Sequence, residues 1–236
     1  MTSSTAPLET GPSTGDPVCF RDLTTIRVGG PIGHLVTATT SAELVRAVRE
    51  ADAAGTPMLL LGGGSNLLVG DEGFDGTVVR IATTGLEVDD TRVRVDAGVE
   101  WDLVVRTALD HGLAGPEALS GIPGTAGGTP VQDVGAYGTS TSEWLETVTV
   151  LDRQTGEVEV WDNARCGFGS HRSSAFKYTD RYVVVDVTFR FQRSEMSAPV
   201  RYAALAERLG VRIGDSVSAR EVRDAVVALR TDRGMV

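Results

Sequence analysis

The first part of the chain carries the pattern of a β-α-β unit. Four apolar residues recur at helical spacing after position 41, namely Leu44, Val45, Val48 and Ala51. We expect Ser41 to cap this helix, with Glu43 one place short of an ideal capping box, and Gly55 to end it. The apolar run over 57–61 predicts a strand buried on both sides. With the extended segment before Ala38, the pattern predicts strand, helix and strand.

The rest of the chain mostly has the alternating pattern of strands. We predict strands over 78–82, 86–90, 91–99 and 182–193, a hairpin over 147–161, and helices over 101–112 and 218–231. Ser218 and Glu221 have the spacing of a capping box. Two sets of alternating apolar residues should each share one face of a strand: Val93, Val95 and Ala97, and then Val183, Val185, Val187, Phe189 and Phe191.

These elements indicate an α+β protein built from two subdomains. We expect a tail over 1–17, one subdomain over 18–80, a second over 81–193, and the beginning of a third domain over 194–236. The last helix is followed by a glycine and two apolar residues, as though further chain were to follow. We therefore expect a truncated protein.

Composition and charge argue against several classes of protein. The 236 residues have a net charge of −10, which disfavours nucleic acid or an anionic membrane as a partner. Cys19 and Cys166 form no CxxC pair, which argues against a disulfide framework or a zinc site. The chain has no signal peptide pattern and no run near the roughly 20 apolar residues of a membrane helix. We expect a cytoplasmic protein with reduced thiols, no metal and a small-molecule partner.

Two glycine-rich stretches are the candidates for ligand binding. The sequence GGGSN over 62–66 follows a predicted buried strand, where backbone N–H groups could surround a phosphate or where the chain simply turns. It has neither the lysine of a Walker loop nor the GxGxxG spacing of a dinucleotide fingerprint. The second stretch, 121–138, reads GIPGTAGGTPVQDVGAYG and contains one ionisable acid, Asp133. Two such loops favour a long ligand with a central diphosphate, and a flavin over a nicotinamide.

Five motifs give the chain a specific resemblance. In order, they are LTTIRVGGP, LLLGGGSNLLV, SGIPGTAGGTPVQDVGAYG, CGFGSHRSSAFK and ALRTDRG. From about residue 20 to residue 236 the chain resembles the UDP-N-acetylenolpyruvoylglucosamine reductases of peptidoglycan synthesis. The resemblance implies the FAD-binding fold of the vanillyl-alcohol oxidase type, with two α+β subdomains and a third domain that covers the substrate.

The resemblance also implies roles for individual residues. The FAD diphosphate would be bound by Gly62, Gly63, Gly64, Ser65 and Asn66. The flavin and its ribityl chain would be lined by Ile122, Pro123, Gly128, Thr129, Gln132, Gly135 and Ala136. The substrate would be contacted by Tyr137, Tyr202, Arg230 and Arg233.

The family reaction needs a fixed positive charge. By resemblance, NADPH supplies a hydride to FAD, and reduced FAD passes it to the enolpyruvyl double bond of a UDP-sugar. Negative charge then develops beside the substrate carboxylate, and Arg172 occupies the family position that stabilises it. Outside its RSSxFK context, an arginine would more often be structural.

The chain departs from the family pattern in several places. His171 replaces a tyrosine, which brings a titratable group beside Arg172. Asp133 replaces an asparagine, and Arg233 replaces a lysine. The family's general acid, a serine, and its partner glutamate would both lie after Val236.

Three functions remain open at this point. The first is the reductase, which we expect to be a monomer. The second is another flavoprotein of the same fold that oxidises a sugar or an aldonolactone, and the third is a flavin-binding remnant without turnover. Reoxidation of the reduced flavin by the substrate would separate the first from the others.

Overall fold

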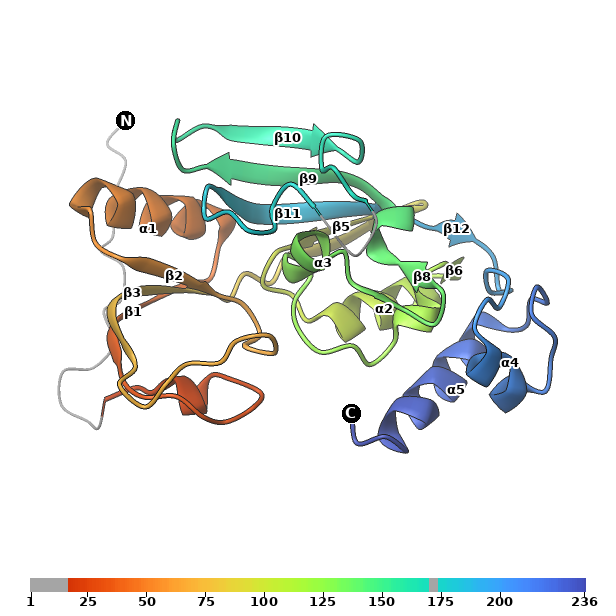
Figure 1. Ribbon diagram of the computed structural model, residues 1–236. Coiled ribbons are helices and arrows are strands. Elements are labelled where there is room, and N and C mark those ends of the chain that lie inside the picture. The colour runs from red at the N-terminus through yellow and green to blue at the C-terminus, as the bar shows by residue number, and fades with distance from the viewer. Residues whose placement is uncertain (1–16, 170–173) are drawn as a thin grey trace. The chain divides into compact units, whose positions relative to one another are not determined.

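A computed structural model describes residues 17–169 and 174–236 (Figure 1). The chain divides into two compact units, Met1–Thr83 and Thr84–Val236. In the described ranges, no helix is both long and apolar enough to cross a bilayer. Within the same ranges, no three His, Cys, Asp or Glu residues are grouped as they would be around a metal ion.

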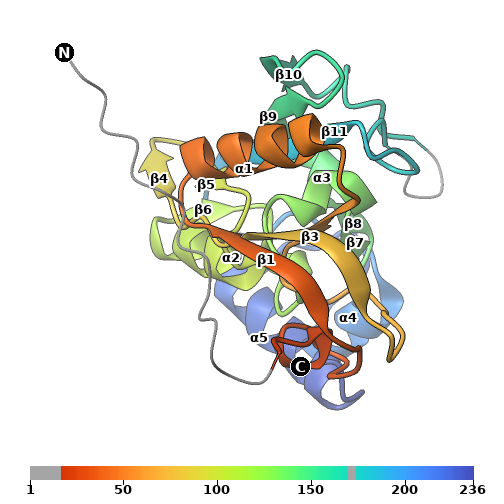
Figure 2. The ribbon, with the colours of Figure 1, turned by 90° about the vertical axis from the view of Figure 1, so that its left-hand side faces the viewer.

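The first unit is a parallel sheet with one helix packed on it. The strands lie in the order β1 (Ile32–Ala38), β3 (Phe74–Ile81) and β2 (Met58–Leu61). Helix α1 (Ser41–Ala54) connects β1 to β2 and lies across the sheet (Figures 1 and 2). The predicted β-α-β unit is confirmed, with β3 inserted between its two strands.

Two local predictions in this unit are wrong. The cap of α1 is Thr40, not Ser41: the Thr40 side chain accepts a hydrogen bond from the Glu43 N–H, and the Glu43 carboxylate accepts one from the Thr40 N–H. Moving the cap back one residue gives Glu43 the spacing that a capping box requires. Strand β2 is half-buried except at Leu61, because it lies at the sheet edge and has a neighbour on one side only.

The second unit is built on a five-stranded antiparallel sheet. Its order is β10 (Val158–Asp162), β9 (Leu145–Asp152), β11 (Tyr182–Arg190), β5 (Arg92–Asp96) and β4 (Leu86–Asp89). The predicted hairpins β4–β5 and β9–β10 are confirmed. Helix α2 (Trp101–Asp110) packs against the sheet through Trp101, whose ring lies 5.3 Å from that of Phe189 (Figure 1).

Strand β11 is more deeply buried than its alternation predicts. The five apolar residues from Val183 to Phe191 are buried, but so are Val184 and Asp186. A register shift between Val184 and Asp186 interrupts the alternation, so the expectation of one unbroken apolar face is wrong. As the central strand of the sheet, β11 has a neighbouring strand along each edge.

Short elements complete the second unit. They are β6 (Leu113–Ala114) paired with β12 (Gln192–Arg193), α3 (Gly128–Gln132), β7 (Gly135–Ala136) paired with β8 (Thr139–Ser140), and 3₁₀ turns at Glu117–Leu119 and Thr141–Glu143. A further 3₁₀ turn, Phe20–Asp22, lies in the first unit. Helices α4 (Ala203–Leu209) and α5 (Ala219–Thr231) then pack together around Leu205 and Val226.

Residues 194–236 belong to the second unit in this division of the chain, and their assignment to a separate domain stays a prediction. Helix α5 begins after Ser218, as expected. The Ser218 side chain makes no capping hydrogen bond within the described chain, so the predicted capping box is wrong.

Candidate functional site

The loop after β2 presents a run of unpaired backbone donors. Within the described chain, the N–H groups of residues 62–66 donate no hydrogen bond. Gly64 is buried at φ +64°, and its carbonyl accepts a hydrogen bond from the Thr25 N–H. A Cβ at Gly64 would lie 2.2 Å from the Leu23 carbonyl oxygen, so the loop admits only glycine there.

Such a run of amides can bind an anion. Unpaired backbone N–H groups on a turn point their positive dipoles at one region of space and favour phosphate or carboxylate oxygens. Gly64 is buried, and because a buried N–H without a partner is costly, a bound anion would remove that cost at Gly64. The geometry of Gly62, Gly63, Gly64, Ser65 and Asn66 therefore fits the diphosphate role expected from the sequence.

The second glycine-rich loop is fixed to the end of β5. The Ala126 N–H donates to the Val99 carbonyl at 2.8 Å, and the Gly127 N–H donates to the Ala97 carbonyl at 2.9 Å. A Cβ at Gly127 would lie 2.5 Å from that of Ala97, whereas a Cβ at Gly128 would meet nothing within 4 Å. Gly127 is thus needed for packing, and Gly128 leaves open space beside α3.

Helix α3 and the residues around it contain the expected flavin-lining positions. Thr129 is buried and its hydroxyl donates to the Ala126 carbonyl, while the half-buried Gln132 side chain has no hydrogen bond in the described chain. The other predicted positions are half-buried, except the exposed Pro123: Ile122, Pro123, Gly128, Gly135 and Ala136. An unpaired amide beside a glycine with open space fits a planar, polar ligand.

Asp133 has a structural task in this loop. It is buried at the end of α3, at φ +39°, and its carboxylate accepts a hydrogen bond from the Ser142 N–H at 3.3 Å. That bond ties α3 to the 3₁₀ turn that follows β8.

The RSSxFK motif meets the same loop. Arg172 and His171 lie outside the described residues. Two positions after Arg172, the Ser174 hydroxyl donates to the Val131 carbonyl of α3 at 2.9 Å. Phe176 is buried against Trp161, with ring centroids 5.3 Å apart. The described part of the motif, from Ser174 onward, therefore contacts the glycine-rich loop through Ser174 and the sheet through Phe176.

Two of the predicted substrate residues are in contact. The rings of Tyr137 and Tyr202 are 5.4 Å apart and nearly perpendicular, an edge-to-face arrangement. Tyr137 follows β7 at φ +50°, and Tyr202 directly precedes α4. Residues 65 positions apart in sequence thus meet, as a shared role requires.

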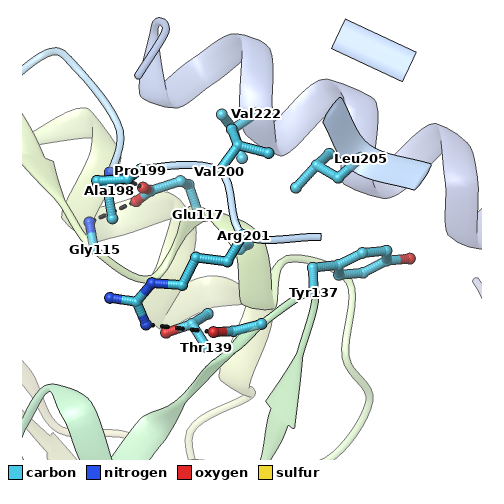
Figure 3. Close-up of a pocket in the computed structure, with 12 residues that line it drawn as sticks. Gly115, Glu117, Tyr137, Thr139, Ala198, Pro199, Val200, Arg201, Leu205 and Val222 are labelled. Carbon is cyan, nitrogen blue, oxygen red and sulfur yellow. Dashed lines mark hydrogen bonds between the residues drawn. The ribbon is translucent and has the colours of Figure 1, made fainter. Parts of the chain in front are cut away.

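A pocket that sequence reasoning missed lies beside Tyr137 (Figure 3). Glu117 lines it and is 1% exposed; its carboxylate accepts hydrogen bonds from the N–H groups of Gly115 and Ala198. Burial raises the pKa of Glu117 above 4.5, although these two bonds oppose the shift. The one acidic residue in the otherwise uncharged run LAGPEALSGI was the signal that could have identified it.

Arg201 forms the other polar side of this pocket. Its guanidinium donates to the Glu143 carboxylate at 2.7 Å and to the Gly138 carbonyl at 3.3 Å. Glu117 thus bonds the segment before Tyr202 to the turn over Gly115–Glu117, and Arg201 bonds it to the end of the glycine-rich loop.

The two arginines at the end of α5 differ in their surroundings. Arg230 is 9% exposed and donates to the carbonyls of Gly121 and Met235. Arg233 is exposed and makes no side-chain hydrogen bond or ion pair in the described ranges. In this conformation Arg230 supports the start of the glycine-rich loop, while Arg233 remains available to a ligand.

Both cysteines are buried, with free thiols. Burial, together with nearby Asp162, raises the pKa of Cys166 to about 12, which keeps it protonated and unreactive at neutral pH.

Each of the two glycine-rich loops, taken by itself, has features that suit a protein binding a planar cofactor with a diphosphate. A family model described as an FAD binding domain matches residues 32–161, which is more than half of the chain. The chain belongs to this FAD binding domain family, and FAD is its cofactor.

Curated relatives show which enzymes of this fold the chain is similar to. The UDP-N-acetylenolpyruvoylglucosamine reductase of Thermobifida fusca (strain YX) is 52% identical, over 93% of this chain and 63% of its own length. The enzyme of the same name from Cutibacterium acnes is 50% identical, over 95% of this chain and 61% of its own length. The chain thus spans about 60% of the length of the curated relatives it matches.

Solved structures confirm the expected flavin-binding fold. The crystal structure of UDP-N-acetylenolpyruvylglucosamine reductase from Thermus caldophilus matches with a TM-score of 0.67 and 29% identity, over 92% of this chain and 68% of that one. Glucooligosaccharide oxidase from Acremonium strictum matches with a TM-score of 0.54 at 18% identity, over 78% of this chain and 40% of that one, which supports the fold alone.

Proposed function

We propose that the chain is the FAD-binding part of an NADPH-dependent UDP-N-acetylenolpyruvoylglucosamine reductase of peptidoglycan synthesis. The observation that carries the proposal is the meeting, in the second unit, of two family motifs and Tyr202. The RSSxFK element is bonded to α3 through Ser174, and the loop that contains α3 ends at Tyr137, which contacts Tyr202. The names of relatives at about 50% identity support the same activity. The proposal includes a cytoplasmic monomer.

The residues present fit FAD. The unpaired N–H groups of 62–66 would hold its diphosphate, and the Gln132 amide would bond a polar edge of the flavin. The open space at Gly128 would admit the ring. Bound FAD supplies the capacity to accept a hydride and to release it to a second substrate.

The catalytic residue of the proposal is Arg172. Hydride addition to the enolpyruvyl double bond leaves negative charge that spreads onto the substrate carboxylate, and a proton taken from water then completes the reduction. A guanidinium fixed beside that carboxylate lowers the barrier, because it favours charge that develops in the transition state. Its planar fork can donate two parallel hydrogen bonds to the carboxylate.

The remaining residues of the proposal bind the substrate rather than react with it. Tyr137 and Tyr202 would contact the sugar and the diphosphate, since each ring is partly exposed and has a polar end. Arg233 would pair with a phosphate. Arg230 would act on the substrate through Gly121, by holding the loop that Arg230 supports.

Product analysis tests the proposal. The purified chain, loaded with FAD, is incubated with NADPH and UDP-N-acetylglucosamine enolpyruvate, and the sugar nucleotide is examined by mass spectrometry. We expect a product heavier by two hydrogens, one of which carries the label when the transferred hydrogen of NADPH is deuterium. NADPH oxidation without that product would contradict the proposal.

A further inference from the structure

One motif of the resemblance is left without a role by the proposed site. The segment LTTIRVGGP, residues 23–31, precedes β1. It lies beside the loop over 62–66 of the same unit, the amide loop. Its Thr25 N–H donates to the Gly64 carbonyl at 3.1 Å, and its Gly30 N–H donates to the Gly70 carbonyl at 2.9 Å. The two segments therefore run side by side from Gly64 to Gly70.

The backbones of these two segments are in close contact, which fixes their relative position. A Cβ on Gly64 would lie 2.2 Å from the Leu23 oxygen, and a Cβ on Gly29 would lie 3.3 Å from that of Val69. No side chain separates the two backbones at these points. Residues 24–28 therefore have a fixed position next to the unpaired N–H groups of 62–66.

Arg27 lies at the turn of this segment in an uncommon backbone conformation. Its φ is +55°, a region that residues other than glycine seldom adopt. The turn is closed by the Arg27 N–H, which donates to the Thr24 carbonyl, and by the Thr24 hydroxyl, which donates to the Val28 carbonyl. Strained residues held by their surroundings are concentrated at ligand-binding sites.

The Arg27 side chain is exposed and has no partner among the residues that the structure describes. Within the described chain its guanidinium makes no hydrogen bond and no ion pair, in a protein whose net charge is −10. A cation on the segment that contacts the loop over 62–66 adds its positive potential to that of the loop's amides. Together they suit a phosphate group, to which guanidinium and amide donors form short, charge-assisted hydrogen bonds.

Exposed apolar side chains lie on the same two segments. Ile26, Val28 and Leu68 are 58%, 41% and 74% exposed. Three large aliphatic side chains on two adjoining segments make a surface that water solvates poorly. A nucleotide can cover both features, because its phosphates are charged and its sugar and base have apolar faces.

We propose that Arg27 is a further binding residue for the diphosphate of a dinucleotide, positioned beside the amide loop by the turn over 24–28. The inference rests on the proposed role of 62–66 in FAD binding, and it assigns Arg27 to FAD. NADPH also carries a diphosphate, so the test compares the two.

The test replaces the guanidinium without disturbing the fold. Glycine accepts a φ of +55° without strain, so Arg27→Gly removes the charge and relieves the turn. Arg27→Lys keeps the charge. Arg49→Ala, on the exposed side of α1, removes one positive charge at a distance and controls for net charge.

FAD, riboflavin and NADP+ are the probes. Each purified apoprotein is titrated with FAD and with riboflavin, which lacks phosphate, and each FAD-loaded protein is titrated with NADP+. For Arg27→Gly we expect the FAD dissociation constant to rise about 10-fold to 100-fold, with that for riboflavin unchanged. Arg27→Lys should stay within about 5-fold of the original chain, and Arg49→Ala within about 2-fold.

The outcomes separate this inference from the proposed function. An Arg27→Gly protein that binds FAD as tightly as the original chain would overturn the assignment of Arg27. Weaker binding of NADP+ with unchanged binding of FAD would also overturn it, because the residue would then serve the other dinucleotide. Failure of the original chain to bind FAD would overturn the proposed cofactor site, and this inference with it.

Discussion

Arg223 of α5 donates two hydrogen bonds to the Asp102 carboxylate of α2, at 2.7 and 2.8 Å. The same carboxylate accepts the Gly121 N–H at 2.7 Å, at the first residue of the glycine-rich loop. Although burial raises the pKa of Asp102, its bonds with Arg223 and Gly121 outweigh that effect and lower it below 3.8. One ion pair thus links two helices to the loop that we assign to the flavin.

Breaking the Asp102–Arg223 ion pair should lower the free energy of unfolding far more than breaking the exposed Asp110–Arg220 pair. We expect Asp102→Asn to lower the free energy of unfolding by about 2 kcal/mol, because it leaves Arg223 half-paired in a mostly buried position. Asp110→Asn, which breaks the exposed ion pair with Arg220 between the same two helices, should cost about 0.5 kcal/mol or less. Urea unfolding measures both, and equal losses would contradict the role given to Asp102.

Two glycine variants, one in the amide loop and one outside it, test the close contact at Gly64. Gly64→Ala should destabilise the first unit by more than about 2 kcal/mol and abolish FAD binding, because its Cβ would clash with the Leu23 carbonyl. Gly55→Ala has a nearly identical φ of +65° but open space around its Cβ, so it should cost about 1 kcal/mol and leave FAD bound. Thermal unfolding and retained flavin absorbance measure the difference. Similar stability of the two variants would refute the close contact at Gly64.

Two glutamates should make opposite contributions to the pH dependence of stability. Burial raises the pKa of Glu117 in the folded protein, so its stabilising contribution is complete below pH 4.5 and is lost as the pH rises through the raised value. The Arg92 and Arg190 guanidinium groups lower the pKa of Glu146 to about 2, so its contribution is present above pH 4.5 and is lost as the pH falls.

Urea unfolding between about pH 3 and pH 7 tests both signs at once. From acid to neutral pH, the original chain should lose stability relative to Glu117→Gln and gain it relative to Glu146→Gln. The gain should be small, because the Glu146 ion pairs are partly exposed to water. If the original chain instead gained stability relative to Glu117→Gln as the pH rose, the two N–H bonds of Glu117 would outweigh its burial.

Arg172 should affect chemistry and not cofactor binding. We expect Arg172→Ala to keep FAD and its reduction by NADPH, while reduction of the enolpyruvyl group falls by more than about 100-fold. Arg193→Ala, in an exposed ion pair with Asp90, is the matched control and should keep full activity. Substrate reduction that survives in the Arg172 variant would remove that residue from the mechanism.

Local patterns predicted most of the fold because they act over a few residues. The period-2 alternation in β5 and the Gln154-Thr155-Gly156 turn between β9 and β10 each specify structure on their own. The cap at Thr40, the edge position of β2 and the register shift in β11 could not be derived in this way. They depend on which strand pairs with which, and that is decided by contacts distant in sequence.

The candidate site likewise has features that the sequence predicted and features that it did not. Glycine content identified both loops, but it could not show that Gly127 packs on Ala97 whereas Gly128 faces open space. It could not show that Glu117 bonds Ala198, 81 residues away. Sequence assigned Arg230 to the substrate, and the structure finds its guanidinium buried against Gly121. The role of each charged residue follows from its partners, which composition does not reveal.

The most direct measurement of the central claim is an anaerobic visible spectrum of the FAD-loaded chain, recorded before NADPH, after NADPH, and after UDP-N-acetylglucosamine enolpyruvate. We predict flavin bands that bleach with NADPH and return when the enolpyruvyl substrate is added. Bands that bleach and then stay bleached in the presence of the substrate would contradict the account, because the chain would bind and reduce its cofactor without performing the reductase reaction.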